Sequence, residues 1–112
     1  MRKAQKQEVL DLIQSLYQAH EEIKEALAQR NSILAQNMIA ECQEFAVSLG
    51  ESIEQIEGEG HTTVSYIEAY CETLYHIHGT LENDTYNESN VYKKLKKQLL
   101  KVENSTKNDI TV

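Results

Sequence analysis

Apolar residues recur at steps of three and four along most of this sequence, and that spacing constrains the fold more than any other feature. Residues three or four apart lie on one face of an α-helix, so such a run predicts an amphipathic helix. The chain also contains no proline and only four glycines, and these are the two residues least favourable inside helices. We therefore expect an all-α fold. The first run, from about Ala4 to Gln29, comprises Val9, Ile13, Leu16, His20, Ile23 and Leu27.

Two further runs occupy the middle of the chain. Gly50 falls inside the second of them, where it marks either a close contact between helices or a kink, because an interior glycine costs about 1 kcal/mol relative to alanine. The second run contains Leu34 or Ala35, Met38, Cys42, Phe45, Leu49, Ile53 and Ile56, and the third contains Val64, Ile67, Cys71, Leu74, His78 and Leu81.

Polar segments separate the runs and supply helix caps. Asn31 or Ser32 is expected to begin the second helix, because short polar side chains accept hydrogen bonds from free backbone N–H groups. Gly58 or Gly60 can adopt the left-handed conformation that closes a helix. Further caps are expected at Thr62 or Thr63 for the third helix and at Asn87 or Ser89 for the fourth.

These elements predict an all-α, antiparallel, up-down-up three-helix bundle over residues 1–82. Steps of three and four also suit coiled-coil packing at a shallow angle. Residues 83–90 are expected to form a loop, residues 91–103 a fourth, Lys-rich amphipathic helix, and residues 104–112 a flexible tail. The fourth helix either completes a bundle or reaches a second chain, and the sequence leaves both arrangements open.

Composition excludes several classes of protein. No apolar run approaches the roughly 18 residues that span a bilayer, and no charged-then-apolar leader precedes a cleavage site. Two cysteines do not make a disulfide scaffold, so we expect free thiols. With 18 acidic and 11 basic residues the formal net charge is −7, which disfavours general binding to nucleic acid. A cytoplasmic protein is expected.

The charge is unevenly distributed along the chain. Residues 1–82 carry 5 basic and 14 acidic side chains, whereas residues 83–112 carry 6 basic and 4 acidic ones. No Lys or Arg occurs between Asn31 and Tyr92. Such asymmetry indicates either an interaction surface or a basic helix that packs beside acidic helices of the same chain.

The lysines and tyrosines are the best candidates for a partner-binding surface. Exposed Tyr is enriched in protein interfaces, and the alternative is that these rings surround the core. A basic amphipathic helix can instead lie on an anionic membrane. We expect a protein partner or a second copy, as a homodimer, and no small-molecule substrate. The candidate partner-binding residues are Tyr66, Tyr70, Tyr75, Lys93, Lys94 and Lys97.

One helix face carries residues that bind metals in other proteins. Glu68, Glu72 and His76 follow one another at steps of four, and a Glu and a His one turn apart can bind a metal on a helix. Carboxylate-bridged di-metal bundles need Glu-x-x-His on two helices, and the sequence contains no such motif. A small metal-binding protein is therefore the alternative, and a solvated helix face, with no metal and no cofactor, is expected.

The sequence contains no catalytic constellation. His20 is followed by two carboxylates, which would repel a phosphoryl group, and it lies in an apolar run. Cys42 and Cys71 also lie in apolar runs, where cysteine behaves as a small apolar residue. The Glu57–Gly60 turn lacks the Lys and Ser/Thr of a phosphate-binding loop. The chain is therefore expected not to be an enzyme.

The block from Gln7 to Ile77 resembles a helical N-terminal region found in some clostridial proteins. The matching features are the Cys-Gln-Glu run at 42–44, the Glu-Gly-Glu-Gly turn at 57–60, the Thr-Val-Ser that follows it, and the Tyr-Cys-Glu at 70–72. Several of those proteins continue into a domain like the CDP-glycerol:glycerophosphate glycerophosphotransferases of teichoic-acid synthesis. The resemblance implies a Gram-positive, cytoplasmic, membrane-proximal accessory module and transfers no catalytic residue. After Leu81 this chain departs from the pattern with its Lys-rich helix.

Together these observations predict a non-catalytic helical module for protein–protein interaction or oligomerisation. The resemblance adds that it is accessory to cell-envelope polymer synthesis. The alternatives are a metal-binding bundle and a membrane-surface adaptor that uses the Lys-rich helix.

Overall fold

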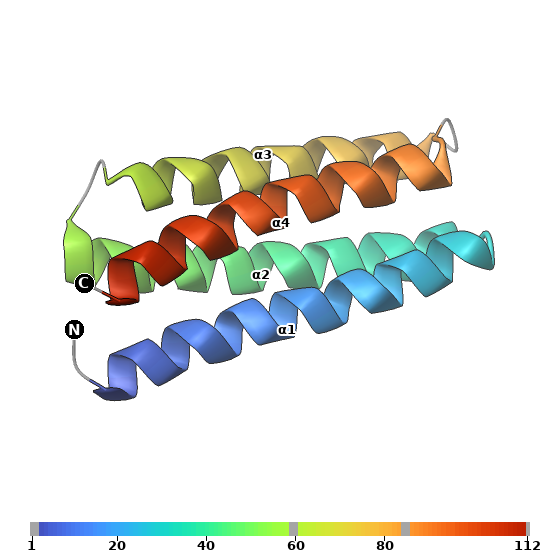
Figure 1. The fold of residues 1–112 in the computed structure, drawn as a ribbon. Coiled ribbons are helices and arrows are strands. Elements are labelled where there is room, and N and C mark those ends of the chain that lie inside the picture. Colours follow the sequence, from blue (N-terminus) through green and yellow to red (C-terminus); the bar gives the residue numbers. More distant parts are fainter. Residues whose placement is uncertain (1–2, 59–60, 84–85, 112) are drawn as a thin grey trace.

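Four long helices make up nearly all of the computed structural model, which describes residues 3–58, 61–83 and 86–111. Within these residues there is no β-strand, so the all-α prediction is confirmed. The helices are α1 (Lys3–Ala28), α2 (Ser32–Glu57), α3 (Thr62–Glu82) and α4 (Glu88–Thr111) (Figure 1).

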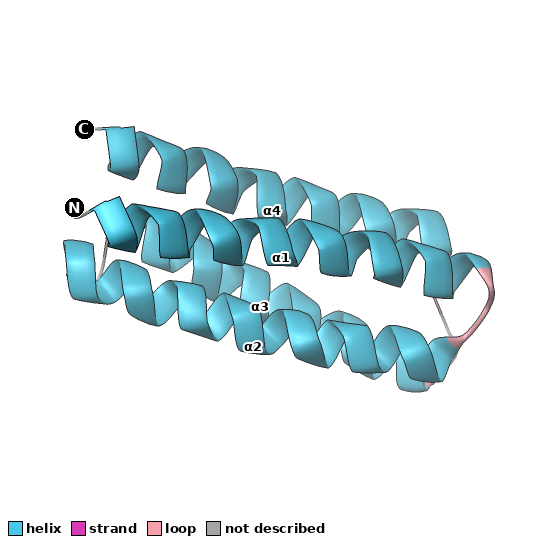
Figure 2. Ribbon diagram, turned by 90° about the horizontal axis from the view of Figure 1, so that it is seen from below, coloured by secondary structure: helices cyan, strands magenta, loops and turns pink. Residues whose placement is uncertain are grey.

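The helices pack side by side in a closed ring. α1 contacts α2, α2 contacts α3, α3 contacts α4, and α4 returns to α1. Consecutive helices run in opposite directions, and the N- and C-terminal ends lie at the same end of the molecule (Figures 1 and 2). The Cα atoms extend over 42 × 22 × 19 Å, so each side of the bundle is a long, narrow face made by two helices.

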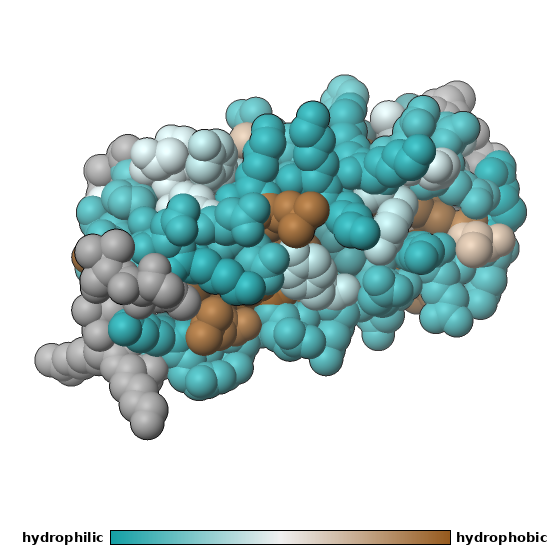
Figure 3. Space-filling view, in the orientation of Figure 1, coloured by the Kyte–Doolittle hydropathy of each residue, from teal (hydrophilic) through white to brown (hydrophobic). Residues whose placement is uncertain are grey.

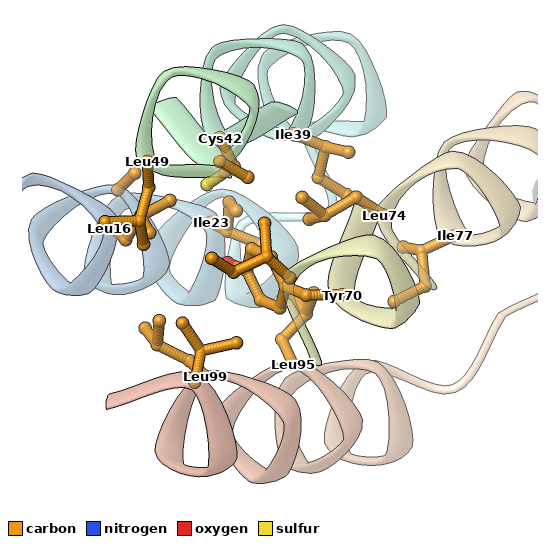
Figure 4. Packing of buried hydrophobic residues seen from close by; sticks show 14 of the residues in the cluster. Leu16, Ile23, Ile39, Cys42, Leu49, Tyr70, Leu74, Ile77, Leu95 and Leu99 are labelled. Atoms are coloured by element: carbon orange, nitrogen blue, oxygen red, sulfur yellow. The ribbon is translucent and has the colours of Figure 1, made fainter. Parts of the chain in front are cut away.

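The apolar stripes meet in one core that all four helices share. Figure 4 shows Tyr70 of α3 in the middle of this core, with Leu95 and Leu99 of α4 on one side and Cys42 of α2 on the other. α4 therefore packs within its own chain and completes the core, one of the two arrangements that the sequence left open. Its contribution to the buried cluster is Val91, Leu95, Leu99 and Val102.

The prediction that residues 104–112 form a flexible tail is wrong. α4 continues to Thr111, and only Val112 lies outside the described residues. Thr106 is fully buried, and its hydroxyl donates to the carbonyl of Val102 at 2.7 Å. Asp109 accepts a hydrogen bond from Thr63 of α3 at 2.5 Å. Polar side chains thus extend the packed face of α4 by two turns beyond Val102, the last residue of α4 in the buried apolar cluster.

Two helix starts follow the sequence prediction and one does not. Oδ1 of Asn31 accepts a hydrogen bond from the backbone N–H of Leu34, and Oδ1 of Asn87 accepts one from the backbone N–H of Asn90, each with an N···O distance of 3.1 Å. α3, however, is capped by His61, whose Nδ1 accepts the N–H of Thr63 at 3.2 Å, and not by Thr62 or Thr63. An imidazole nitrogen with a free lone pair performs the same role as a side-chain oxygen.

Glycines act at two positions. Gly58 ends α2 as expected, but with a φ of 88° and a ψ of 164°, a positive-φ conformation different from the left-handed helical one; its N–H donates to the carbonyl of Glu54 at 2.8 Å. The alternative cap, Gly60, lies outside the described residues. Gly50 allows α2 and α3 to approach closely, because a Cβ there would lie 3.3 Å from Cγ2 of Ile67. The loop between α3 and α4 is shorter than the predicted 83–90, because α4 begins at Glu88.

None of the helices, over the residues described, is long and apolar enough to cross a membrane. Figure 3 shows one face of the bundle, which is mostly hydrophilic with small, separate hydrophobic patches.

Two adjacent leucines of α4 test whether that helix belongs to the core. Leu99 is fully buried and Leu100 is 41% exposed. We expect Leu99→Ala to lower the free energy of unfolding by about 2–5 kcal/mol and Leu100→Ala to change it by about 0.5 kcal/mol or less. Urea unfolding followed by circular dichroism measures both. Equal, small losses in the two variants would contradict this packing of α4.

Candidate functional site

The structure brings the three candidate lysines together in one open hollow between α3 and α4, which we call the α3–α4 groove. Its volume is ≈ 510 Å³, and Ile77 and Val91 form part of its apolar lining. A second hollow continues it along the helices, shares His76, Ile77 and Lys94 with it, and is also lined by Glu72. The other residues lining the first hollow are Thr80, Tyr86, Asn87, Asn90, Lys93 and Lys97.

Three exposed lysines give this groove its positive charge. Lys93, Lys94 and Lys97 are exposed, and none of them forms an ion pair with any residue that the structure describes. The nearby carboxylate of Glu88 is held at 2.9 Å by Arg30. The positive charge of these three lysines is therefore available to a ligand instead of being neutralised by the acidic helices of the same chain.

The three candidate tyrosines do not form one patch. Tyr70 is 1% exposed and belongs to the core, so its assignment to a partner-binding surface is wrong. Tyr66 is 39% and Tyr75 77% exposed, but they are nine positions apart. At 3.6 residues per turn this spacing places them on opposite sides of α3. By helical spacing, Tyr66 lies on the α4 side of α3 with Thr73, and Tyr75 lies on the α2 side with Cys71.

A separate groove, which the sequence did not predict, lies between α2 and α3, and we call it the α2–α3 groove. It has a volume of ≈ 390 Å³, an apolar floor that includes Gly50 and Ile67, and carboxylates along both rims. The one-turn spacing of these glutamates on two helices was visible in the sequence, but only the fold makes the two helices neighbours. The four glutamates are Glu51, Glu54, Glu68 and Glu72.

The alternative metal site is not assembled. No group of three or more His, Cys, Asp or Glu side chains that could hold a metal ion occurs among the described residues. Each step of four residues advances 40° beyond a full helical turn, so Glu68 and His76 diverge around α3. Glu68 lines the α2–α3 groove, whereas His76 lines the α3–α4 groove beside lysines.

The core contains a buried polar cluster of His20, Tyr70 and Cys42. His20 Nε2 and the Tyr70 hydroxyl form a hydrogen bond, and the two rings stack with centroids 5.8 Å apart. The Tyr70 hydroxyl also forms a hydrogen bond with Cys42. The phenol of Tyr70 therefore connects three helices. The polar atoms of this cluster all have partners, as do the other buried side-chain N and O atoms of the described residues.

Burial keeps every member of this cluster uncharged. It lowers the pKa of His20 to about 4 and raises the pKa of the Cys42 thiol to about 12, although the hydrogen bond from Tyr70 partly opposes the latter shift. Burial also raises the pKa of Tyr70. Because the thiolate is the nucleophilic form of cysteine, the cluster stabilises the fold and offers no nucleophile at neutral pH.

A Ser, a His and an Asp also meet at one end of the bundle, but they are not arranged as a catalytic triad. His61 Nε2 lies 3.6 Å from Oδ1 of Asp109, while its Nδ1 is occupied by the backbone N–H of Thr63. Neither ring nitrogen is left to accept a proton from Ser105, which contacts Thr63 Oγ1 at 2.6 Å instead. These hydrogen bonds and the His61–Asp109 contact connect the start of α3 to the end of α4.

Comparison with known proteins gives no further identification. No protein-family model matches the sequence, and no curated protein or solved structure matches it. What the chain does must therefore be inferred from its own surface and core.

Acidification should destabilise the fold through His20. Its pKa is about 6.5 in the unfolded chain and about 4 in the folded protein, so the folded state favours the neutral ring. The stability from this difference is complete above pH 6.5 and is lost as the pH falls through 4. We expect the His20 contribution to fall by about 3 kcal/mol between pH 7 and pH 4, measured by urea unfolding at both values.

Carboxylates titrate over the same range, so the comparison needs variants. His20→Gln should show a pH dependence smaller by about 3 kcal/mol, whereas His76→Gln, at an exposed position, should behave as the wild type. An unchanged pH dependence in His20→Gln would contradict the assignment of the buried, neutral ring.

Proposed function

We propose that this chain is a non-catalytic helical module that binds an acidic protein surface through the α3–α4 groove. The observation that carries the proposal is the set of three exposed lysines around a partly apolar hollow, none with an ion-pair partner among the described residues. Unpaired charge at the rim of an apolar surface is the arrangement that protein interfaces use, with a hydrophobic centre and a polar rim.

The length of the groove supports a protein ligand over a small one. The two hollows that share His76, Ile77 and Lys94 follow α3 and α4 over several turns. An extended, open surface of this kind matches another helix or a helical face, whereas small-molecule sites are concave and enclose most of the ligand. Carboxylates on such a partner would pair with the lysines.

The packing of α4 weighs against the membrane-surface alternative. An interfacial helix binds by inserting its apolar face among the lipids, but the apolar residues Leu95, Leu99 and Val102 of α4 are buried in the core. Docking on an anionic membrane would therefore depend on the lysines alone, or would require the bundle to open.

The resemblance to the helical region of clostridial proteins supports a more specific role. On that basis we propose a cytoplasmic module accessory to cell-envelope polymer synthesis, which positions a glycerophosphotransferase-like enzyme by binding protein and not by chemistry of its own. The uncharged core cluster of His20, Tyr70 and Cys42 fits a module without a catalytic residue.

Site-specific photo-crosslinking in the native host tests the proposal. A photoreactive amino acid at Lys97 should give a discrete adduct, and the same group at Gln18, an exposed position on α1, should not. The adduct should disappear when Lys93→Glu and Lys94→Glu are added, because the charge that attracts the partner is then reversed. Absence of an adduct at Lys97, or identical adducts at both positions, would contradict the proposal.

A further inference from the structure

We propose that the partner is a second copy of this chain, whose acidic α2–α3 groove docks against the basic α3–α4 groove. This inference rests on the proposed function and identifies the ligand of the same site. It follows from charge complementarity between two hollows of one molecule, each an open groove with an apolar floor between neighbouring helices.

The α2–α3 groove carries negative charge, opposite to that of the lysines. Its four glutamates, two on each helix, have no ion-pair partner among the described residues. No Lys or Arg occurs between Asn31 and Tyr92, so neither α2 nor α3 can supply one. Unpaired like charges along a groove repel each other, and a row of lysines from another copy would relieve this repulsion.

Apolar contacts accompany the charges on both sides. Val47 lines the α2–α3 groove and is 51% exposed. Tyr75 stands on the same side of α3, one turn beyond Cys71, and is the most exposed large apolar side chain of the described residues at 77%. Tyr66 stands on the α4 side of α3. One exposed tyrosine thus stands on each of the two sides of α3 that carry the grooves, and tyrosine is enriched in interfaces.

The dimensions of the bundle suit such a contact. With extents of 42 × 22 × 19 Å, one side of the bundle offers close to the roughly 800 Å² that each partner buries in an interface of standard size. Exposed ion pairs are individually weak and are screened by salt. Association should therefore be reversible and should weaken as the ionic strength rises.

The two grooves lie on adjacent sides of the bundle and share α3, which determines the symmetry of the assembly. Contact between a basic groove and an acidic groove joins two different surfaces, so it is heterologous. A pair of copies joined in this way still has one basic and one acidic groove free. The wild type is therefore not limited to the homodimer expected from the sequence, and association should continue past two copies.

Two variants in which charged side chains are replaced by glutamine test the contact between the basic and the acidic groove by sedimentation velocity. Lys94→Gln/Lys97→Gln weakens the basic groove and leaves the acidic one, and Glu51→Gln/Glu68→Gln does the reverse. At low salt and up to about 1 mM, where weak complexes become populated, the wild type should exceed twice 12.8 kDa. Each variant alone should remain monomeric. Their mixture can form only one contact and should stop at a 1:1 complex.

Matched controls separate this contact from a general effect of charge. Lys6→Gln/Lys96→Gln and Glu8→Gln/Glu25→Gln make the same charge changes away from both grooves and should associate like the wild type. Circular dichroism verifies that every variant is folded.

Three outcomes would overturn the inference. These are a wild type that stays monomeric at every concentration, variants that self-associate as the wild type does, and a mixture that remains monomeric. A monomeric wild type together with a photo-adduct to a different protein at Lys97 would leave the proposed function standing and reject the second copy as its partner. No adduct of any kind would reject both.

Discussion

The packing of the α4 stripe against α1 and α3 is the contact on which the rest of the structure depends. A helix with one apolar face can bury that face only once. Because Val91, Leu95, Leu99 and Val102 are used inside the chain's own core, the lysines between them must point away from it. The same contact closes the ring of helices and creates the α3–α4 groove. Core and surface are thus two results of one amphipathic pattern.

The polar cluster inside this core gives it a specific arrangement. Tyr70 reaches from α3 to His20 on α1 and Cys42 on α2. An apolar core alone tolerates alternative packings, whereas a buried hydroxyl, imidazole and thiol must all keep their partners or incur the cost of desolvation. The cluster therefore favours one register of three helices, and in that register the two grooves take their shape.

Much of the fold could be predicted from the sequence, since periodicity and caps are local signals. The apolar runs located the first three helices and the Lys-rich amphipathic segment located the fourth, and Asn31, Gly58 and Asn87 marked helix ends as expected. The end of α4 was missed because Thr106 and Asp109 are polar. Their steps of four and three after Val102 continue the stripe, but hydropathy does not reveal a residue that is buried through its hydrogen bonds.

The candidate site could be predicted only in part, because it depends on which helices become neighbours. The lysines of α4 were identified from their clustering, and the structure brings Lys93, Lys94 and Lys97 to one groove. Tyr70 was misplaced although it lies three residues after Ile67 and four before Leu74, which is core spacing. The acidic groove required glutamates from two helices to face each other, and no spacing within one helix indicates that pairing.

Native-state hydrogen exchange tests most directly the claim that α4 belongs to a single cooperative core. If it does, the amides of Leu95, Leu99 and Val102 should exchange with the same free energy of opening as those of Cys42 and Leu49 in α2, which is that of global unfolding. If α4 amides instead exchange by a separate opening of much lower free energy, the helix is an appendage. The outward orientation of its lysines, and the α3–α4 groove, would then have no fixed basis.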